Sequence, residues 1–198
     1  MDGDGIAELT SNLNEDDASL RKILRSETRD AHDRLDTAVT SLDLADPDSY
    51  RDFLTFQYAA RLPVEQWLAS QAEAPTLPPT TPLIAQDLAA LGAPLPLTRM
   101  FGRSLDNGAI GVAWALAGSH LGNRAILHGL KNDSAFAGPT AFLADERMRD
   151  AWRDLLPHLE APPHEAYAER AVYAASKVFV HFNEALDLLR DSGKSLAA

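Results

Sequence analysis

His32 is the residue best placed for ligand chemistry. It lies in LRSETRDAHDRLD, where apolar residues recur at three- and four-residue steps and predict a helix with His32 at the edge of its buried stripe. Arg25 lies on the same edge, about 10 Å away at 1.5 Å per residue. An imidazole can ligate iron and a guanidinium can bind a carboxylate, so the pair suits a ligand that offers both. An ordinary boundary histidine and a surface ion pair are the alternatives.

A second segment concentrates glycine on one predicted helix. At 100° per residue, six small residues fall within an arc of about 100°: Gly108, Gly111, Ala115, Gly118, Ser119 and Gly122. Each glycine costs about 1 kcal/mol relative to alanine in a helix. Either a closely packed helix or a large flat ligand could compensate, and the glycines alone leave both open.

Together, the two segments resemble bacterial biliverdin-producing heme oxygenases, in matching order from about Leu24 to Leu188. LRSETRDAHDRLD is similar to the family's proximal helix, in which a histidine four residues after a threonine ligates the heme iron; here these are Thr28 and His32. AGSHLGNR resembles the glycine-rich distal motif, with Gly118 and Gly122 as the matching glycines. IAQDLAALG, ERMRDAWRDLL and AVYAASKVFVHF are similar to other family segments.

The resemblance implies an all-α fold, a single-domain heme oxygenase-like helical bundle with heme between a proximal and a glycine-rich distal helix. Heme would be cofactor and substrate, its iron ligated by His32. The reaction would consume O2 and electrons from a donor such as a ferredoxin and its reductase, and yield biliverdin, carbon monoxide and ferrous iron. A neutral histidine ligand suits O2 binding.

The resemblance also assigns site residues. Gly118, Ser119 and Gly122 would be catalytic, since a bare distal face brings backbone close to bound O2 and leaves room for water. Ser119 could anchor such a water or bond back to its own helix. Heme propionates would bind Arg25, Arg149 and Arg153, although the last two could instead pair with Asp145, Glu146, Asp150 or Asp154. Phe179 would pack near the heme edge or serve only as core.

Three positions depart from the family pattern: Asn123 replaces a second glycine, Ser119 an aspartate and Ala113 a tyrosine. Asn123 keeps a rival hypothesis open, a non-catalytic heme-binding or heme-sensing protein with the same fold. A plain helical interaction module is a further alternative. A di-iron carboxylate enzyme would need paired Glu-x-x-His motifs, which the sequence lacks.

Composition narrows the classes of partner. The 198 residues carry a net charge of -11, which argues against nucleic-acid or anionic-membrane binding. Cysteine is absent, so a protein-held metal needs nitrogen or oxygen ligands. The amino terminus lacks a signal-peptide pattern, and no apolar run reaches the roughly 20 residues of a membrane span, so a cytoplasmic protein is expected.

Periodicity and helix-end signals predict six helices: about 17–42, 46–70 with a kink at Pro63, 82–92, 105–130, 140–156 and 165–190. A flexible acidic leader (1–15) and a flexible tail (193–198) would flank one domain (16–192). Among the other histidines, His120 is expected to point away from the glycine face, and His128, His158, His164 and His181 to lie at helix ends or surfaces.

Overall fold

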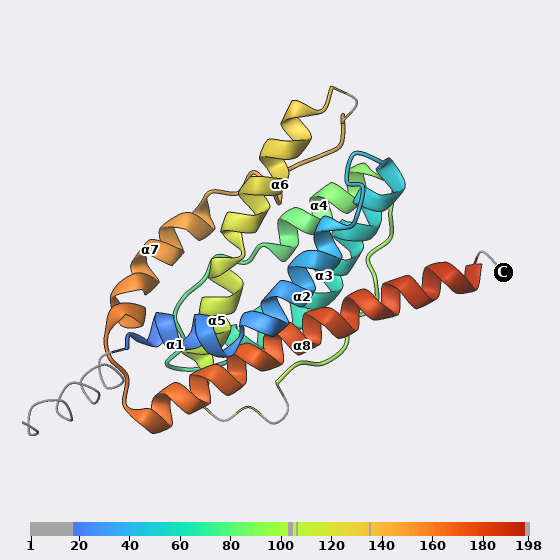
Figure 1. Cartoon of the computed structure of the whole chain (residues 1–198). Coiled ribbons are helices and arrows are strands. Elements are labelled where there is room, and N and C mark those ends of the chain that lie inside the picture. Colours follow the sequence, from blue (N-terminus) through green and yellow to red (C-terminus); the bar gives the residue numbers. More distant parts are fainter. Residues whose placement is uncertain (1–17, 103–104, 106, 135, 197–198) are drawn as a thin grey trace, which may run out of the picture.

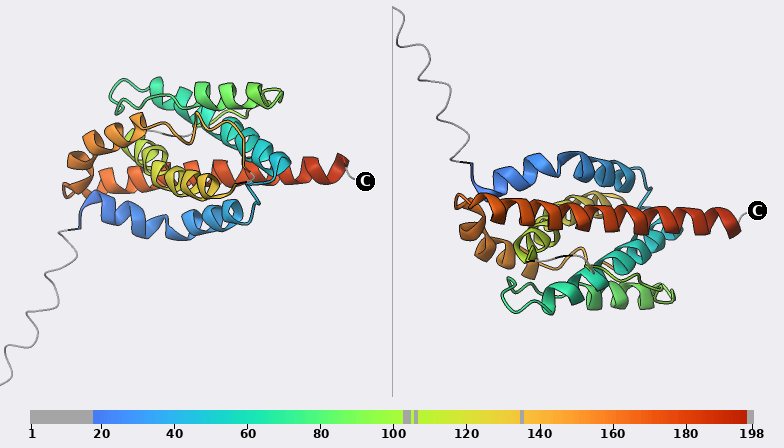
Figure 2. Two further views of the ribbon diagram at one scale, coloured as in Figure 1. Left: turned by 90° about the horizontal axis from the view of Figure 1, so that it is seen from above. Right: turned by 90° about the horizontal axis from the view of Figure 1, so that it is seen from below.

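All regular elements of the described chain are helices, and one long helix runs along the lower side of the others in Figure 1. The computed structural model describes residues 18–102, 105, 107–134 and 136–196, with backbone only for 191–196; the predicted leader lies outside these ranges. This helix, α8 (Glu165–Leu196), continues into the predicted tail and packs against α1, α2, α3 and α5. Figure 2 shows α1 and α2 on one side of α8 and α3 and α4 on the other.

The predicted helix 17–42 is divided into α1 (Leu20–Glu27) and α2 (Arg29–Thr40). The division lies at Thr28, whose buried hydroxyl donates to the carbonyl of Leu24 at 2.8 Å. A hydroxyl that bonds to a carbonyl of the preceding turn bends a helix. The prediction of one continuous helix was therefore wrong at Thr28. Ser19 caps the start of α1 by accepting the amide of Lys22.

Helices α3 (Pro47–Ala69) and α4 (Thr81–Ala90) confirm the two predicted helices, while the kink at Pro63 stays a prediction. Asp46 caps α3 by accepting the amide of Ser49, and the helix runs through Pro63 without interruption. After α4, Gly92 adopts φ +68 and the amides of Gly92 and Ala93 bond to the last turn, which ends the helix.

The predicted helix 105–130 is also divided, into α5 (Ala109–Gly118) and α6 (His120–Asn132). The predicted helix 140–156 is displaced: α7 spans Arg147–Glu160, continuing past Pro157. Residues 140–144 instead form a turn, because the buried carboxylate of Asp87 accepts the amides of Ala141 and Phe142 at 3.0 and 2.9 Å. This contact joins α4 to the chain before α7.

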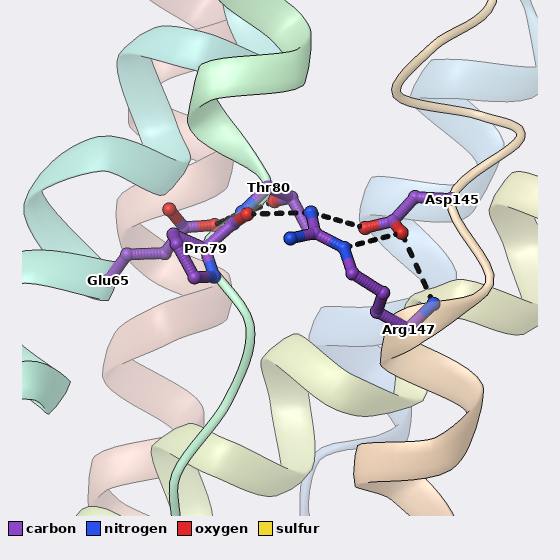
Figure 3. Close-up of polar contacts among 5 residues, drawn as sticks. All are labelled: Glu65, Pro79, Thr80, Asp145 and Arg147. Atoms are coloured by element: carbon purple, nitrogen blue, oxygen red, sulfur yellow. Dashed lines mark hydrogen bonds and ion pairs between the residues drawn. The ribbon is translucent and has the colours of Figure 1, made fainter.

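A polar network links α3, α4 and the start of α7 (Figure 3). The carboxylate of Glu65 accepts the amide and hydroxyl of Thr80 at 2.9 and 2.6 Å, which satisfies donors at the start of α4. Arg147 donates to the carbonyl of Pro79 at 3.1 Å and forms two bonds with the carboxylate of Asp145. The network therefore ties the end of the 71–80 segment to α3 through Glu65 and to α7 through Arg147.

We expect Asp87→Ala to lower the free energy of unfolding by about 2–4 kcal/mol, because the amides of Ala141 and Phe142 lose the carboxylate that accepts their hydrogen bonds. Gln86→Ala is the matched control, since Gln86 is exposed on the same helix. Urea unfolding followed by circular dichroism measures both. Equal stability of the two variants would contradict the role given to Asp87.

Candidate functional site

His32 lies outside the protein core on α2. Its backbone amide bonds to the carbonyl of Thr28 at 2.9 Å, so it lies one turn after the bend. The side chain of His32 is 58% exposed. Its Nδ1 faces the carboxylate of Asp33 at 3.5 Å, so an Nδ1–H tautomer leaves Nε2 as the open coordinating atom.

Phe179 from α8 connects His32 to α5. The two ring centroids are 5.8 Å apart in an edge-to-face arrangement, and Phe179 also lies 6.3 Å from the ring of Trp114. Phe179 is buried, whereas Trp114 is partly exposed. The structure thus brings together two residues that the sequence placed near a ligand, His32 and Phe179, and adds Trp114, which precedes Gly118 by one turn.

Ser119 marks the bend between α5 and α6. Its hydroxyl donates to the carbonyl of Leu116 at 2.6 Å and accepts from Nη2 of Arg61 at 2.8 Å. Of the two roles considered for Ser119, the bond back to its own helix is therefore present. A catalytic role for Ser119 stays a prediction.

The glycines do not form one uniform bare face, which corrects the prediction that these small residues share one. A Cβ at Gly111 would collide with the carbonyl oxygen of Ala171 in α8, and one at Gly108 with the Cβ of Ala174. At Gly118 a Cβ would meet only the ring of Trp152, at 3.6 Å, an ordinary contact. Close helix packing thus explains Gly108 and Gly111.

Gly122 has no packing partner of this kind. A Cβ there would meet no atom within 4 Å, and the same holds for Gly129. These two residues are seven apart and so share one face of α6. Sequence reasoning missed Gly129, although the seven-residue spacing was a usable signal. Open space at these glycines is what a ligand lying against the helix would require.

Helices α2 and α6 have few buried side chains. None of the residues of α2 is buried, and in α6 only His120 and Leu130 are. Apolar residues on both helices are only partly covered: Leu35, Ala38 and Val39 on α2, and Ile126 and Leu127 on α6. Incomplete burial on both helices, together with the exposed His32 and open Gly122, fits the binding of a large apolar ligand that carries a metal.

Three arginines were predicted to bind carboxylates of the ligand, and they differ in their surroundings. Arg25 is exposed and has no ion-pair partner among the described residues. Arg153 pairs with Asp150 at 2.9 Å, and Arg149 lies 3.4 Å from Glu146 and 3.7 Å from Asp150. For Arg149 and Arg153, the alternative of ion pairs along the helix is the one present. Their part in ligand binding stays a prediction.

Arg149 also lines a small cavity of about 80 Å³ with His120 and Arg124. Arg124 lies about 200° around α6 from Gly122, so this cavity is on the other side of the helix. His120 is buried, with Nδ1 2.7 Å from the carbonyl of Ala117, and points away from Gly122 as expected. His181 is partly buried rather than superficial, and this burial lowers its pKa.

The described residues contain no group of three or more histidines and acidic residues that could hold a metal ion. None of the described helices combines the length and apolar character needed to cross a bilayer.

Arg61 is a site residue that sequence reasoning missed. It is 2% exposed, contacts Ser119 and comes from α3, where it follows Gln57 by one turn. Its position within the buried stripe of Phe53, Gln57, Ala60, Val64 and Leu68 was the available signal.

Comparisons with known proteins identify the fold. No family model matches the chain, and no curated protein matches it. A solved structure does: the NO- and CO-bound heme oxygenase from Neisseria meningitidis, with a TM-score of 0.69 and 21% sequence identity. The match covers 86% of this chain and 92% of that one. The protein therefore has the heme oxygenase fold, as the sequence predicted.

The two sets of glycines should respond oppositely to the same substitution. We expect Gly122→Ala to raise the free energy of unfolding of the ligand-free protein by about 0.5–1 kcal/mol, because alanine favours the helix and meets open space. Gly111→Ala should lower it by about 1–3 kcal/mol through its collision with Ala171. Chemical denaturation measures both, and a destabilising Gly122→Ala would show that the space is occupied by protein.

Proposed function

We propose that this protein is a heme oxygenase, which cleaves heme to biliverdin with release of carbon monoxide and ferrous iron, using O2 and external electrons. The observation that carries the proposal is an exposed His32 on α2 whose Nε2 is open, together with open space at Gly122 on α6. The shared fold with a heme oxygenase supports it. Heme would be the substrate and would itself supply the iron that binds O2.

His32 would ligate the iron through Nε2. An Nδ1–H tautomer would direct its hydrogen to Asp33, 3.5 Å away, and Phe179 lies edge-on to the ring. Thr28 would set the direction of α2 through its bond to Leu24. These contacts orient the imidazole before the ligand arrives, which reduces the ordering cost of binding.

Gly118 and Gly122 would let the backbone of the α5–α6 bend approach the ring of the ligand. Without side chains on this face, water can enter beside the O2-binding position and deliver protons. Arg25, which has no ion-pair partner among the described residues, would bind a propionate, and Arg149 and Arg153 would have to exchange their present ion pairs for that role.

We further propose that the electrons come from a donor such as a ferredoxin with its reductase, and that the protein acts in the cytoplasm. The net charge of -11 makes nucleic acid and anionic membranes poor partners. For an acidic donor, docking would depend on local basic residues near the site, among which Arg25 is exposed.

A non-catalytic heme-binding or heme-sensing protein is the second candidate, and one observation favours it. The hydroxyl hydrogen of Ser119 is already donated to Leu116, and Arg61 occupies one of its acceptor positions. Asn123 follows Gly122 where a second glycine would leave more room. This candidate predicts heme that stays intact when reductant and air are supplied.

The first test is turnover of a one-to-one mixture of protein and hemin with a ferredoxin system, in air and with catalase present. We expect the heme absorption band to be lost as biliverdin absorption grows. His32→Ala should abolish this and weaken hemin binding by roughly tenfold or more, or about 1.4 kcal/mol. His128→Ala is the control, an exposed histidine on α6. A heme band that persists in the wild-type protein would reject the oxygenase in favour of the binding protein.

Gly122→Ala provides an independent test on hemin binding. We expect Gly122→Ala to weaken hemin affinity by roughly tenfold while it stabilises the ligand-free protein. The added methyl group would occupy the space that the porphyrin ring fills in the proposed complex. Titration followed at the heme band measures the affinity. Unchanged affinity in Gly122→Ala would show that heme does not lie against this face.

A further inference from the structure

Arg61 is a cation enclosed in the protein core. Its Nε donates to the side-chain oxygen of Gln57 and its Nη2 to the hydroxyl of Ser119, both at 2.8 Å. The rings of Phe142 and Phe182 lie 5.1 and 5.7 Å from the guanidinium carbon. Among the described residues, no carboxylate is within ion-pair distance of it. A fully buried charge without a counter-ion is costly.

The guanidinium nevertheless stays charged at neutral pH. Burial lowers the pKa of Arg61 to about 10, and the nearby Glu65 acts in the opposite direction. Core packing alone does not call for a cation here, because an apolar side chain of similar volume often stabilises a buried site as well or better. The contacts of Arg61 therefore need another explanation.

The contact with Ser119 supplies one. The bend between α5 and α6 depends on the hydroxyl of Ser119, which reaches the carbonyl of Leu116. Arg61 donates to the oxygen of that hydroxyl. This contact favours the rotation of the Ser119 hydroxyl in which its hydrogen points to the carbonyl of Leu116. The planar guanidinium is itself oriented by Gln57. Two residues of α3 therefore support the bend between α5 and α6 from the protein core.

We propose that Arg61 is a positioning residue that holds the α5–α6 bend through Ser119 and so sets how closely Gly118 and Gly122 approach the ligand. The second half rests on the proposed heme-binding function. Arg61 acts here through Ser119 and the backbone, and contacts neither iron nor O2.

Hydrogen exchange of the ligand-free protein tests the first half. We expect Arg61→Met and Ser119→Ala each to speed exchange of the amides of residues 120–123 by roughly tenfold relative to amides of α8, with no further gain in the double variant. Val64→Ala is the control, because Val64 is equally buried on α3 and contacts the core without a bond to Ser119. It should leave that ratio unchanged. If Arg61→Met and Val64→Ala change exchange alike, the proposal is overturned.

Carbon monoxide bound to the ferrous heme complex tests the second half without turnover. The C–O stretching frequency reports the polarity and distance of the groups around the bound gas. We expect it to shift in Arg61→Met and in Ser119→Ala but not in Val64→Ala, with Arg61→Lys in between because one ammonium cannot reproduce the two-armed contact. An unchanged frequency in Arg61→Met overturns the positioning role.

The two failures can be told apart. If the wild-type protein binds no hemin, the proposed function fails, while the exchange experiment still decides whether Arg61 holds the bend. If hemin binds and the exchange ratio does not change in Arg61→Met, the positioning proposal fails and the heme-binding function stands.

Discussion

The close approach of α5 to α8 is the constraint on which the rest of the structure depends. At Gly111 the carbonyl of Ala171 occupies the space of a β-carbon, and Ala174 does the same at Gly108. Because the two helices lie this close, Phe179 of α8 reaches both Trp114 on α5 and His32 on α2. The lower helix propensity of Gly108 and Gly111 is thereby offset by the close packing of α5 against α8.

The same kind of hydrogen bond bends both helical segments of the proposed site, α1–α2 and α5–α6. Thr28 bends the helix that carries His32, and Ser119 bends the helix that carries Gly122. In each case a side-chain hydroxyl bonds to a carbonyl of the preceding turn. The two bends differ in their support, since Thr28 is simply buried in the core whereas Ser119 is also held by Arg61 from α3.

Binding and catalysis depend on different features of this arrangement. In the proposed function, heme binding would use the open Gly122 face, the imidazole of His32 and a cation such as Arg25 for the propionates. The proposed turnover would also require protons beside O2, which water on the open Gly122 face would deliver. Ser119 contributes to the shape of the helix through bonds that already engage its hydroxyl.

The sequence by itself determined the all-α class, because apolar periodicity records which face of each helix is buried, and it singled out His32 and Phe179. It predicted one continuous helix at 17–42 and another at 105–130, since a local pattern cannot show that the hydroxyls of Thr28 and Ser119 bond to backbone carbonyls. For the same reason it grouped Gly108 and Gly111 with Gly118 and Gly122. Only the tertiary structure decided that α8 fills the space at the first pair and leaves Gly122 open, and that Arg61 lies behind Ser119, because these depend on which helix packs against which face.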